Sequence, residues 1–270
     1  MIDELFFKEG FQKKKVDYIL FGFVVALIGM VTSFLIFGIK SSQAQLLMVT
    51  LLLLPAVVKL ISKEEKIVRN QGFKHVFANH KGVFEVFIFL FIGVFLAFFF
   101  MQLILMAKGH DLRVAYEFQT GILDDNSFLS YGFFGDKADT ASFGGLIFSL
   151  LWKLLGVMIV TFGLSFLYGA GGVFVLVAMA TIFSTMVLYL LKATVFVKFS
   201  LVYLFFVLVL TVPVILTSVA GGVISKAFIH EKVRSKFFKE VMREGFIIFM
   251  VAMALTVVIA LVWAILLFVV

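Results

Sequence analysis

An apolar stretch from Ile147 to Ile182 constrains this chain more than any other feature. It is 36 residues long and holds one charged residue, Lys153. At about 1.5 Å per residue, a single helix of that length would far exceed the ~30 Å thickness of the hydrocarbon core of a bilayer. The stretch must therefore fold back, and the turn is expected at Gly169-Ala170-Gly171-Gly172, because glycine accepts backbone angles that other residues resist. The sequence predicts two membrane helices joined by a tight turn with Gly169, Gly171 and Gly172 as its structural residues.

The composition extends this interpretation to the whole chain. Hydrophobic residues make up 63% of it and charged residues 14%, whereas soluble domains are about 45–50% apolar and about a quarter charged. The expected fold is all-α, a polytopic transmembrane bundle of about seven spans. The expected spans are Val16–Ile39, Ala44–Ile61, Val83–Met106, the two helices of the opening stretch with the second continuing to about Leu191, Phe199–Ser225, and Phe246 to the C-terminus.

The spans suggest a division into two parts. Residues 1–82 would comprise an N-terminal amphipathic segment, a two-span hairpin and a basic cytoplasmic linker. Residues 83–270 would form a five-span membrane domain with an external loop at 107–144. Within that loop, the alternation of Val114, Tyr116 and Phe118 is typical of a short strand.

A basic amphipathic segment at 226–245 precedes the last span. Its apolar stripe predicts a helix lying in the plane of the membrane interface. Four of its basic residues are expected to contact anionic lipid, namely Lys232, Arg234, Lys236 and Lys239.

The distribution of basic residues predicts the orientation. With seven spans, the segments on the N-terminal side of the membrane hold 16 Lys and Arg, and those on the other side hold 6. Because Lys and Arg concentrate in cytoplasmic loops, the N-terminus is expected to be cytoplasmic and the C-terminus outside the cell membrane.

The sequence shows no catalytic constellation. It has no cysteine, and it lacks the HExxH, P-loop, dinucleotide and GxSxG motifs. No charged residue falls near the middle of an expected span, where such residues usually mark function. We therefore expect neither an enzyme nor a bound cofactor or metal.

Small residues are instead the distinctive feature of the spans. In the sixth span, Ser218 with Gly222 and Gly221 with Ser225 give two interleaved pairs four residues apart. Such pairs let a neighbouring helix approach closely, so this face is expected to pack against the fourth or fifth span. Further close-approach residues are expected at Gly156 and Gly163 of the fourth span, and on one face of the first at Gly22, Ala26, Gly29 and Ser33.

Two glycine-rich strings carry a family resemblance. FLYGAGGVFVL at 166–176 and SVAGGVIS at 218–225, the latter preceded by Pro213 and followed by the basic segment at 226–245, resemble the stage II sporulation protein M family, mainly its archaeal relatives. The resemblance covers about residues 83–270. Polar positions of those relatives are replaced here, by Val214 where they often carry glutamate and by 178–181 where they tend to have Trp-Asn-Ala-Ser.

The resemblance implies an integral membrane protein that anchors partners during membrane remodelling. Together with the missing catalytic groups, it favours a non-enzymatic membrane scaffold in membrane remodelling or envelope organisation. The alternative is the membrane subunit of a transporter or exporter for apolar or lipid-like substrates, with a site formed by broken helices. Expected partners are membrane lipids, other membrane or envelope proteins and a second copy of the chain, but no nucleic acid.

Overall fold

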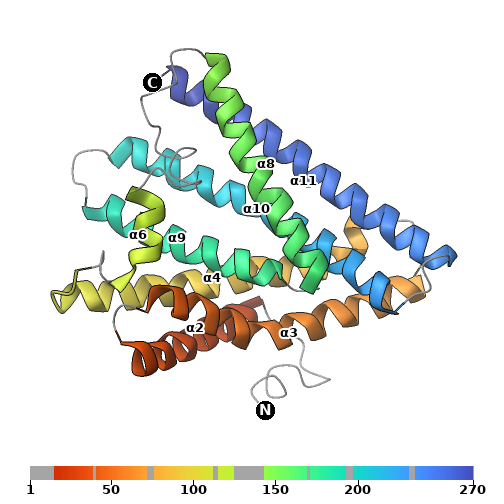
Figure 1. Cartoon of the computed structure of the whole chain (residues 1–270), viewed down its shortest axis with the longest axis horizontal. Coiled ribbons are helices and arrows are strands. Elements are labelled where there is room, and N and C mark those ends of the chain that lie inside the picture. Colours follow the sequence, from red (N-terminus) through yellow and green to blue (C-terminus); the bar gives the residue numbers. More distant parts are fainter. Residues whose placement is uncertain are drawn as a thin grey trace.

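The computed structural model describes residues 15–38, 41–71, 76–111, 115–124, 143–168, 171–192, 197–230 and 235–269. This part of the chain is all-α, as expected (Figure 1). Its eight helices are α2 (Lys15–Phe37), α3 (Ser42–Gln71), α4 (Val76–Ala107), α6 (Glu117–Asp124), α8 (Phe143–Tyr168), α9 (Gly172–Lys192), α10 (Val197–His230) and α11 (Lys236–Val269).

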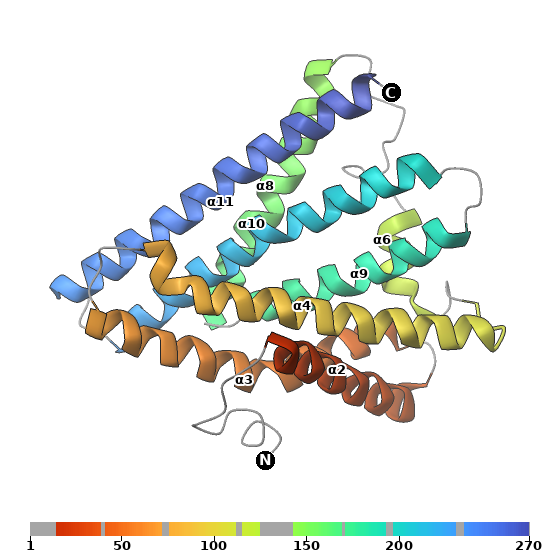
Figure 2. The ribbon, with the colours of Figure 1, turned by 180° about the vertical axis from the view of Figure 1, so that it is seen from behind.

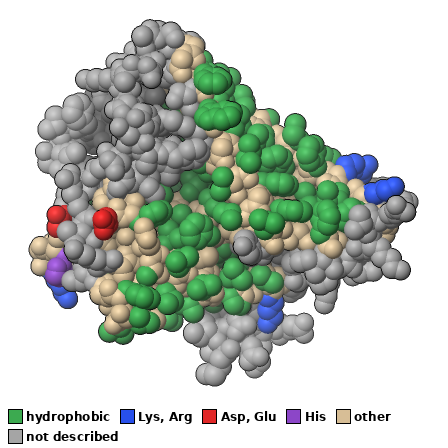
Figure 3. Space-filling model, viewed as in Figure 1, with side chains coloured by type: hydrophobic (Ala, Val, Ile, Leu, Met, Phe, Trp, Pro, Cys, Tyr) green, Lys and Arg blue, Asp and Glu red, His purple; other side chains and the backbone are tan. Residues whose placement is uncertain are grey.

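Six of these helices are long and apolar enough to cross a membrane, namely α2, α3, α4, α8, α10 and α11. A shorter apolar helix covers Gly172–Leu188 of α9. Large apolar side chains cover much of the outer surface, as Figure 3 shows for one face. Leu35 of α2 and Trp152 of α8 are 82% and 73% exposed. An exterior of this kind suits lipid, so the chain is a multi-span helical membrane protein.

The helices form two groups on either side of α10. In Figures 1 and 2, α2, α3, α4 and α9 lie together, while α8 and α11 lie side by side and lean away from them. Buried residues make up 78% of the apolar window of α10, against 29% for α8 and 33% for α11. Helix α10 is therefore the central element, which α8, α9 and α11 pack against.

The basic linker expected before the third span is largely helical. Helix α3 continues to Gln71, and α4 begins at Val76. Hydropathy marks the part of a helix that suits lipid and not the point where the helix ends. Because Lys, Glu and Arg are good helix formers, the segment from Lys63 to Arg69 continues α3 beyond its apolar part.

The prediction of a short strand at Val114, Tyr116 and Phe118 is wrong. Helix α6 occupies Glu117–Asp124, and the backbone N–H of Thr120 donates to the carbonyl oxygen of Tyr116 at 2.8 Å. Val114 lies outside the described residues. Three alternating residues are too short a pattern to separate a strand from a helical turn.

The prediction that one helix covers residues 226–245 is also wrong. Helix α10 ends at His230, and α11 begins at Lys236, with the Ser235 hydroxyl accepting a hydrogen bond from the N–H of Phe238 at 3.1 Å. Part of the apolar stripe packs between these two helix ends: Phe238 and Val241 are buried, whereas Phe228 is 44% exposed. Ala227 packs with Phe238, and the rings of Phe228 and Phe238 meet edge to face with centroids 5.0 Å apart.

Candidate functional site

The glycines predicted to form a turn lie where α8 ends and α9 begins. Helix α8 ends at Tyr168 and α9 begins at Gly172, while Gly169 and Ala170 lie outside the described residues. Gly171 has no left-handed φ, so glycine is required there because a side chain would have no room. A Cβ atom there would collide with the backbone carbonyl of Leu164, so the chain folds back directly onto the last turns of α8.

The first turn of α9 meets α8 and α10 at one point. A Cβ atom on Gly172 would collide with the Ser218 side chain of α10 and would lie 2.5 Å from the Ser165 hydroxyl oxygen of α8. A Cβ atom on Gly221 would lie 2.5 Å from Ser165 Cβ and 2.8 Å from the carbonyl oxygen of Phe162. We call this contact of three helices the glycine junction, formed by Ser165, Gly171, Gly172, Ser218 and Gly221.

The small residues of α10 serve more than one neighbour. Ser218 and Gly221 face α8 and the start of α9, while Gly222 and Ser225 are also buried. Helix α11 approaches nearby through Gly245, where a Cβ atom would lie 2.7 Å from Ile224 Cδ1 and 3.3 Å from the carbonyl oxygen of Ala220.

Gly163 does not take part in this packing. A Cβ atom at Gly163 would have no neighbour within 4 Å, so the close approach expected there is wrong. Because the helix turns by about 100° per residue, Gly163 points away from the face that carries Ser165.

Most hydroxyl groups around the junction bond to their own helices. Thr161 donates to the carbonyl oxygen of Val157 at 2.7 Å, Thr181 to that of Ala178 at 2.8 Å, and Thr217 to that of Pro213 at 2.8 Å. Such bonds occupy the groups that would otherwise bind a polar substrate. The hydroxyls of Ser165 and Ser218 are buried without a hydrogen-bond partner among the described residues.

The residues expected to contact anionic lipid flank the start of α11. Lys232 and Arg234 lie outside the described residues, Lys236 is the first residue of α11, and Lys239 is exposed. The described part of the chain contains no group of three or more His, Cys, Asp or Glu side chains that could hold a metal ion.

Sequence reasoning missed a buried carboxylate close to these lysines. Glu244 of α11 is 1% exposed. Glu244 lies on one helix face with Phe238, Val241 and Ile248, and these three apolar side chains are also buried. Helical spacing from Phe238 could have placed Glu244 inward.

Four further buried polar residues also escaped sequence reasoning, namely Gln45, Gln102, Tyr116 and Gln119. Gln102 of α4 donates from Nε2 to the Thr185 hydroxyl oxygen of α9 at 2.8 Å. Single amides in apolar helices leave hydropathy almost unchanged, so nothing in the sequence distinguishes them.

The fold and the apolar exterior define a polytopic helical membrane protein. Comparison of the chain with protein-family models, curated proteins and solved structures finds no match. The resemblance to the stage II sporulation protein M family therefore has no support from a family model, and the class is established by composition and helix arrangement alone.

Proposed function

We propose that this protein is a non-enzymatic membrane scaffold that binds partner proteins, in membrane remodelling or envelope organisation. The observation that carries the proposal is the glycine junction. Gly221 meets the backbone of α8, and Gly172 meets the side chains of Ser165 and Ser218, so at this point the three helices leave no room for even one added methyl group. A rigid bundle with an extensive apolar exterior instead suits lateral contact with other membrane proteins.

The proposal includes a topology of seven spans. Helix α9 is 21 residues long, and it counts as the fifth span because α8 and α10 run antiparallel to it. The positive-inside rule then gives a cytoplasmic N-terminus and an external C-terminus. In this arrangement the resemblance to the stage II sporulation protein M family extends over α4 to α11.

The alternative is a transporter or exporter of apolar or lipid-like substrates. Pro213 within α10 fits it, because proline weakens a spanning helix and can mark a moving segment. The backbone bonds of Thr161, Thr181 and Thr217 and the close approach of α8 to Gly221 of α10 favour the scaffold. Reconstitution with fluorescent lipid would separate the two, because a scaffold leaves the transbilayer flux equal to that of empty vesicles.

Photo-crosslinking in native membranes tests the scaffold. A photoreactive residue replaces Trp152 on α8 or Leu35 on α2, two exposed side chains on different helix groups. The scaffold predicts a discrete protein adduct from one of these positions, which mass spectrometry would identify. Replacement of the buried Met158 serves as the control, since it should give only intramolecular products. Adducts with lipid alone at both exposed positions would contradict the proposal.

A further inference from the structure

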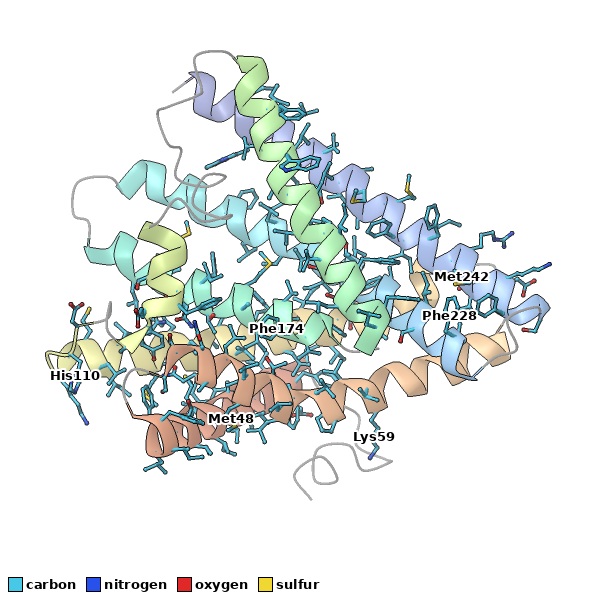
Figure 4. All side chains as sticks on the ribbon, in the orientation of Figure 1. Met48, Lys59, His110, Phe174, Phe228 and Met242 are labelled. Atoms are coloured by element: carbon cyan, nitrogen blue, oxygen red, sulfur yellow. The ribbon has the colours of Figure 1, made fainter. Side chains whose placement is uncertain are left out.

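Helix α6 closes one end of the bundle formed by α3, α4 and α9. It lies beside the ends of α4 and α9 in Figure 1 and packs against α3 and α9. Helix α4 itself runs to a turn near His110, labelled in Figure 4. The hydroxyl oxygen of Ser42, the first residue of α3, accepts a hydrogen bond from the backbone N–H of Phe118 at 3.1 Å. A side chain of α3 thus caps one of the free N–H groups in the first turn of α6.

Four polar side chains are fully buried at this end of the bundle. Gln45 of α3, Gln102 of α4, Tyr116 before α6 and Gln119 within it are each 0% exposed. Among the described residues, five of their polar atoms have no hydrogen-bond partner. These atoms are Gln45 Oε1, Gln102 Oε1, the Tyr116 hydroxyl oxygen and both Oε1 and Nε2 of Gln119.

Contacts between the elements bring these side chains toward one region. The Tyr116 ring meets the Phe98 ring edge to face at 6.5 Å between centroids, and Phe98 lies one helical turn before Gln102. Gln119 follows Tyr116 by three residues and so shares its helix face. Gln45 follows Ser42, which caps α6, by the same spacing.

The unpaired atoms require a partner that the described residues do not supply. A buried polar group without a hydrogen bond loses the bonds that it makes to water in the unfolded chain, so such groups are rare and tend to be satisfied by trapped molecules. Five such atoms on four neighbouring described side chains are many for a dry apolar core.

The three amides and the phenol at this end of the bundle suit an uncharged hydrogen-bonding molecule. Amides and a phenol supply both donors and acceptors, and burial raises the pKa of Tyr116 above its ordinary value, which keeps its hydroxyl protonated as a donor. The charged Glu117 between Tyr116 and Gln119 is exposed. We propose that Gln45, Gln102, Tyr116 and Gln119 enclose a site beneath α6 for small neutral hydrogen-bonding molecules, either water or a solute with amide or hydroxyl groups.

The direction in which Tyr116→Phe changes the melting temperature tests this site. Tyr116→Phe removes a single oxygen atom and preserves the ring that contacts Phe98. If a guest bonds the hydroxyl, the full-length protein in detergent should melt at a lower temperature after the substitution, because the guest loses a partner. If the region is dry, the substitution removes an unpaired buried group. A melting temperature equal to or higher than that of the parent would overturn the proposal.

Added solutes identify the guest. Acetamide is the neutral probe, and acetate is its charged counterpart of similar size. If the site admits solutes, acetamide should raise the melting temperature of the parent relative to acetate, and this difference should disappear in the double variant Tyr116→Phe/Gln119→Leu. If parent and double variant respond equally while Tyr116→Phe alone is less stable, water is the guest.

Discussion

Gly93 of α4 lies directly against Gly22 of α2. A Cβ atom on Gly93 would stand 3.1 Å from the Cα atom of Gly22 and 2.9 Å from the backbone nitrogen of Phe23. On the other glycine, a Cβ atom would stand 2.9 Å from the carbonyl oxygen of Leu90. The two helices therefore cross in backbone contact, a geometry that only small residues permit in a membrane.

Gly93→Leu should separate α2 from α4. Overpacking typically costs about 1–3 kcal/mol, so the melting temperature in detergent should fall clearly. Gly163→Leu is the matched control, since it makes the same chemical change at a position with open space around it. Equal melting temperatures for the two variants would contradict the backbone contact.

Gly221→Leu should disrupt the glycine junction. The new side chain has no room beside Ser165 and Phe162, so we expect destabilisation of about 1–3 kcal/mol or more. Leu208→Ile serves as the control, because Leu208 is 47% exposed on the same helix. The junction would be refuted by a Gly221→Leu protein that melts with the parent and keeps its elution volume on size exclusion.

The hydrogen bond between Gln102 and Thr185 should couple α4 to α9. Interhelical hydrogen bonds in membrane proteins contribute about 0.6 kcal/mol on average and up to about 1.7. A double-mutant cycle with Gln102→Leu and Thr185→Val, followed by unfolding in mixed micelles, should give a coupling energy in this range. Strictly additive effects of the two substitutions would show that the bond contributes nothing.

The proposed orientation can be read from cysteine labelling, because the chain contains no natural cysteine. Single cysteines replace Ser127 in the loop at 107–144 and Ser235 before α11. On intact cells, a membrane-impermeant maleimide should label position 127 and leave position 235 unlabelled until the membrane is opened. The reverse pattern would invert the topology.

Neutralising the basic residues at the start of α11 should weaken contact with anionic lipid. Each basic residue near such a surface contributes about 1 kcal/mol. Replacing Lys232, Arg234, Lys236 and Lys239 with glutamine in the full-length protein should reduce its preference for anionic over zwitterionic lipid, measured by the lipid retained on purification. Glutamine at Lys40, Lys108, Lys192 and Lys198, which the proposed topology places on the opposite side of the membrane, controls for the loss of net charge. An unchanged preference would show that protein contacts alone hold this end of the bundle.

Much of the helix arrangement follows from the sequence because apolar length and small residues leave strong signals. The small face of α2, with Gly22, Ala26, Gly29 and Ser33, is buried in full. The need for a fold-back follows from length, since an apolar stretch of 36 residues is too long for one span, and the glycines at 169–172 give its position. The helix ends are harder, because α3 and α4 extend as helices beyond their apolar parts.

The polar interior could not be predicted in the same way. Gln102 lies on a helix where one polar residue among many apolar ones barely alters the pattern. Glu244 follows Arg243 in a charged stretch, so only its helical spacing from Phe238 indicates that it is buried. Their burial depends on which neighbours α11 and α4 meet, and that is decided by contacts between distant segments. The cap of α6 likewise depends on Ser42, 76 positions away from Phe118.

The crossing of Gly22 and Gly93 bears on how the chain is made. Ribosomes deliver α2 and α3 to the translocon before α4 is synthesised. The small-residue face around Gly22 therefore contacts lipid until Gly93 of α4 packs against it. We expect the hairpin of α2 and α3 to reach its final position only after α4 packs against α2. Truncation after Gln71 should therefore leave a hairpin that inserts and is then recognised by membrane quality control as incomplete.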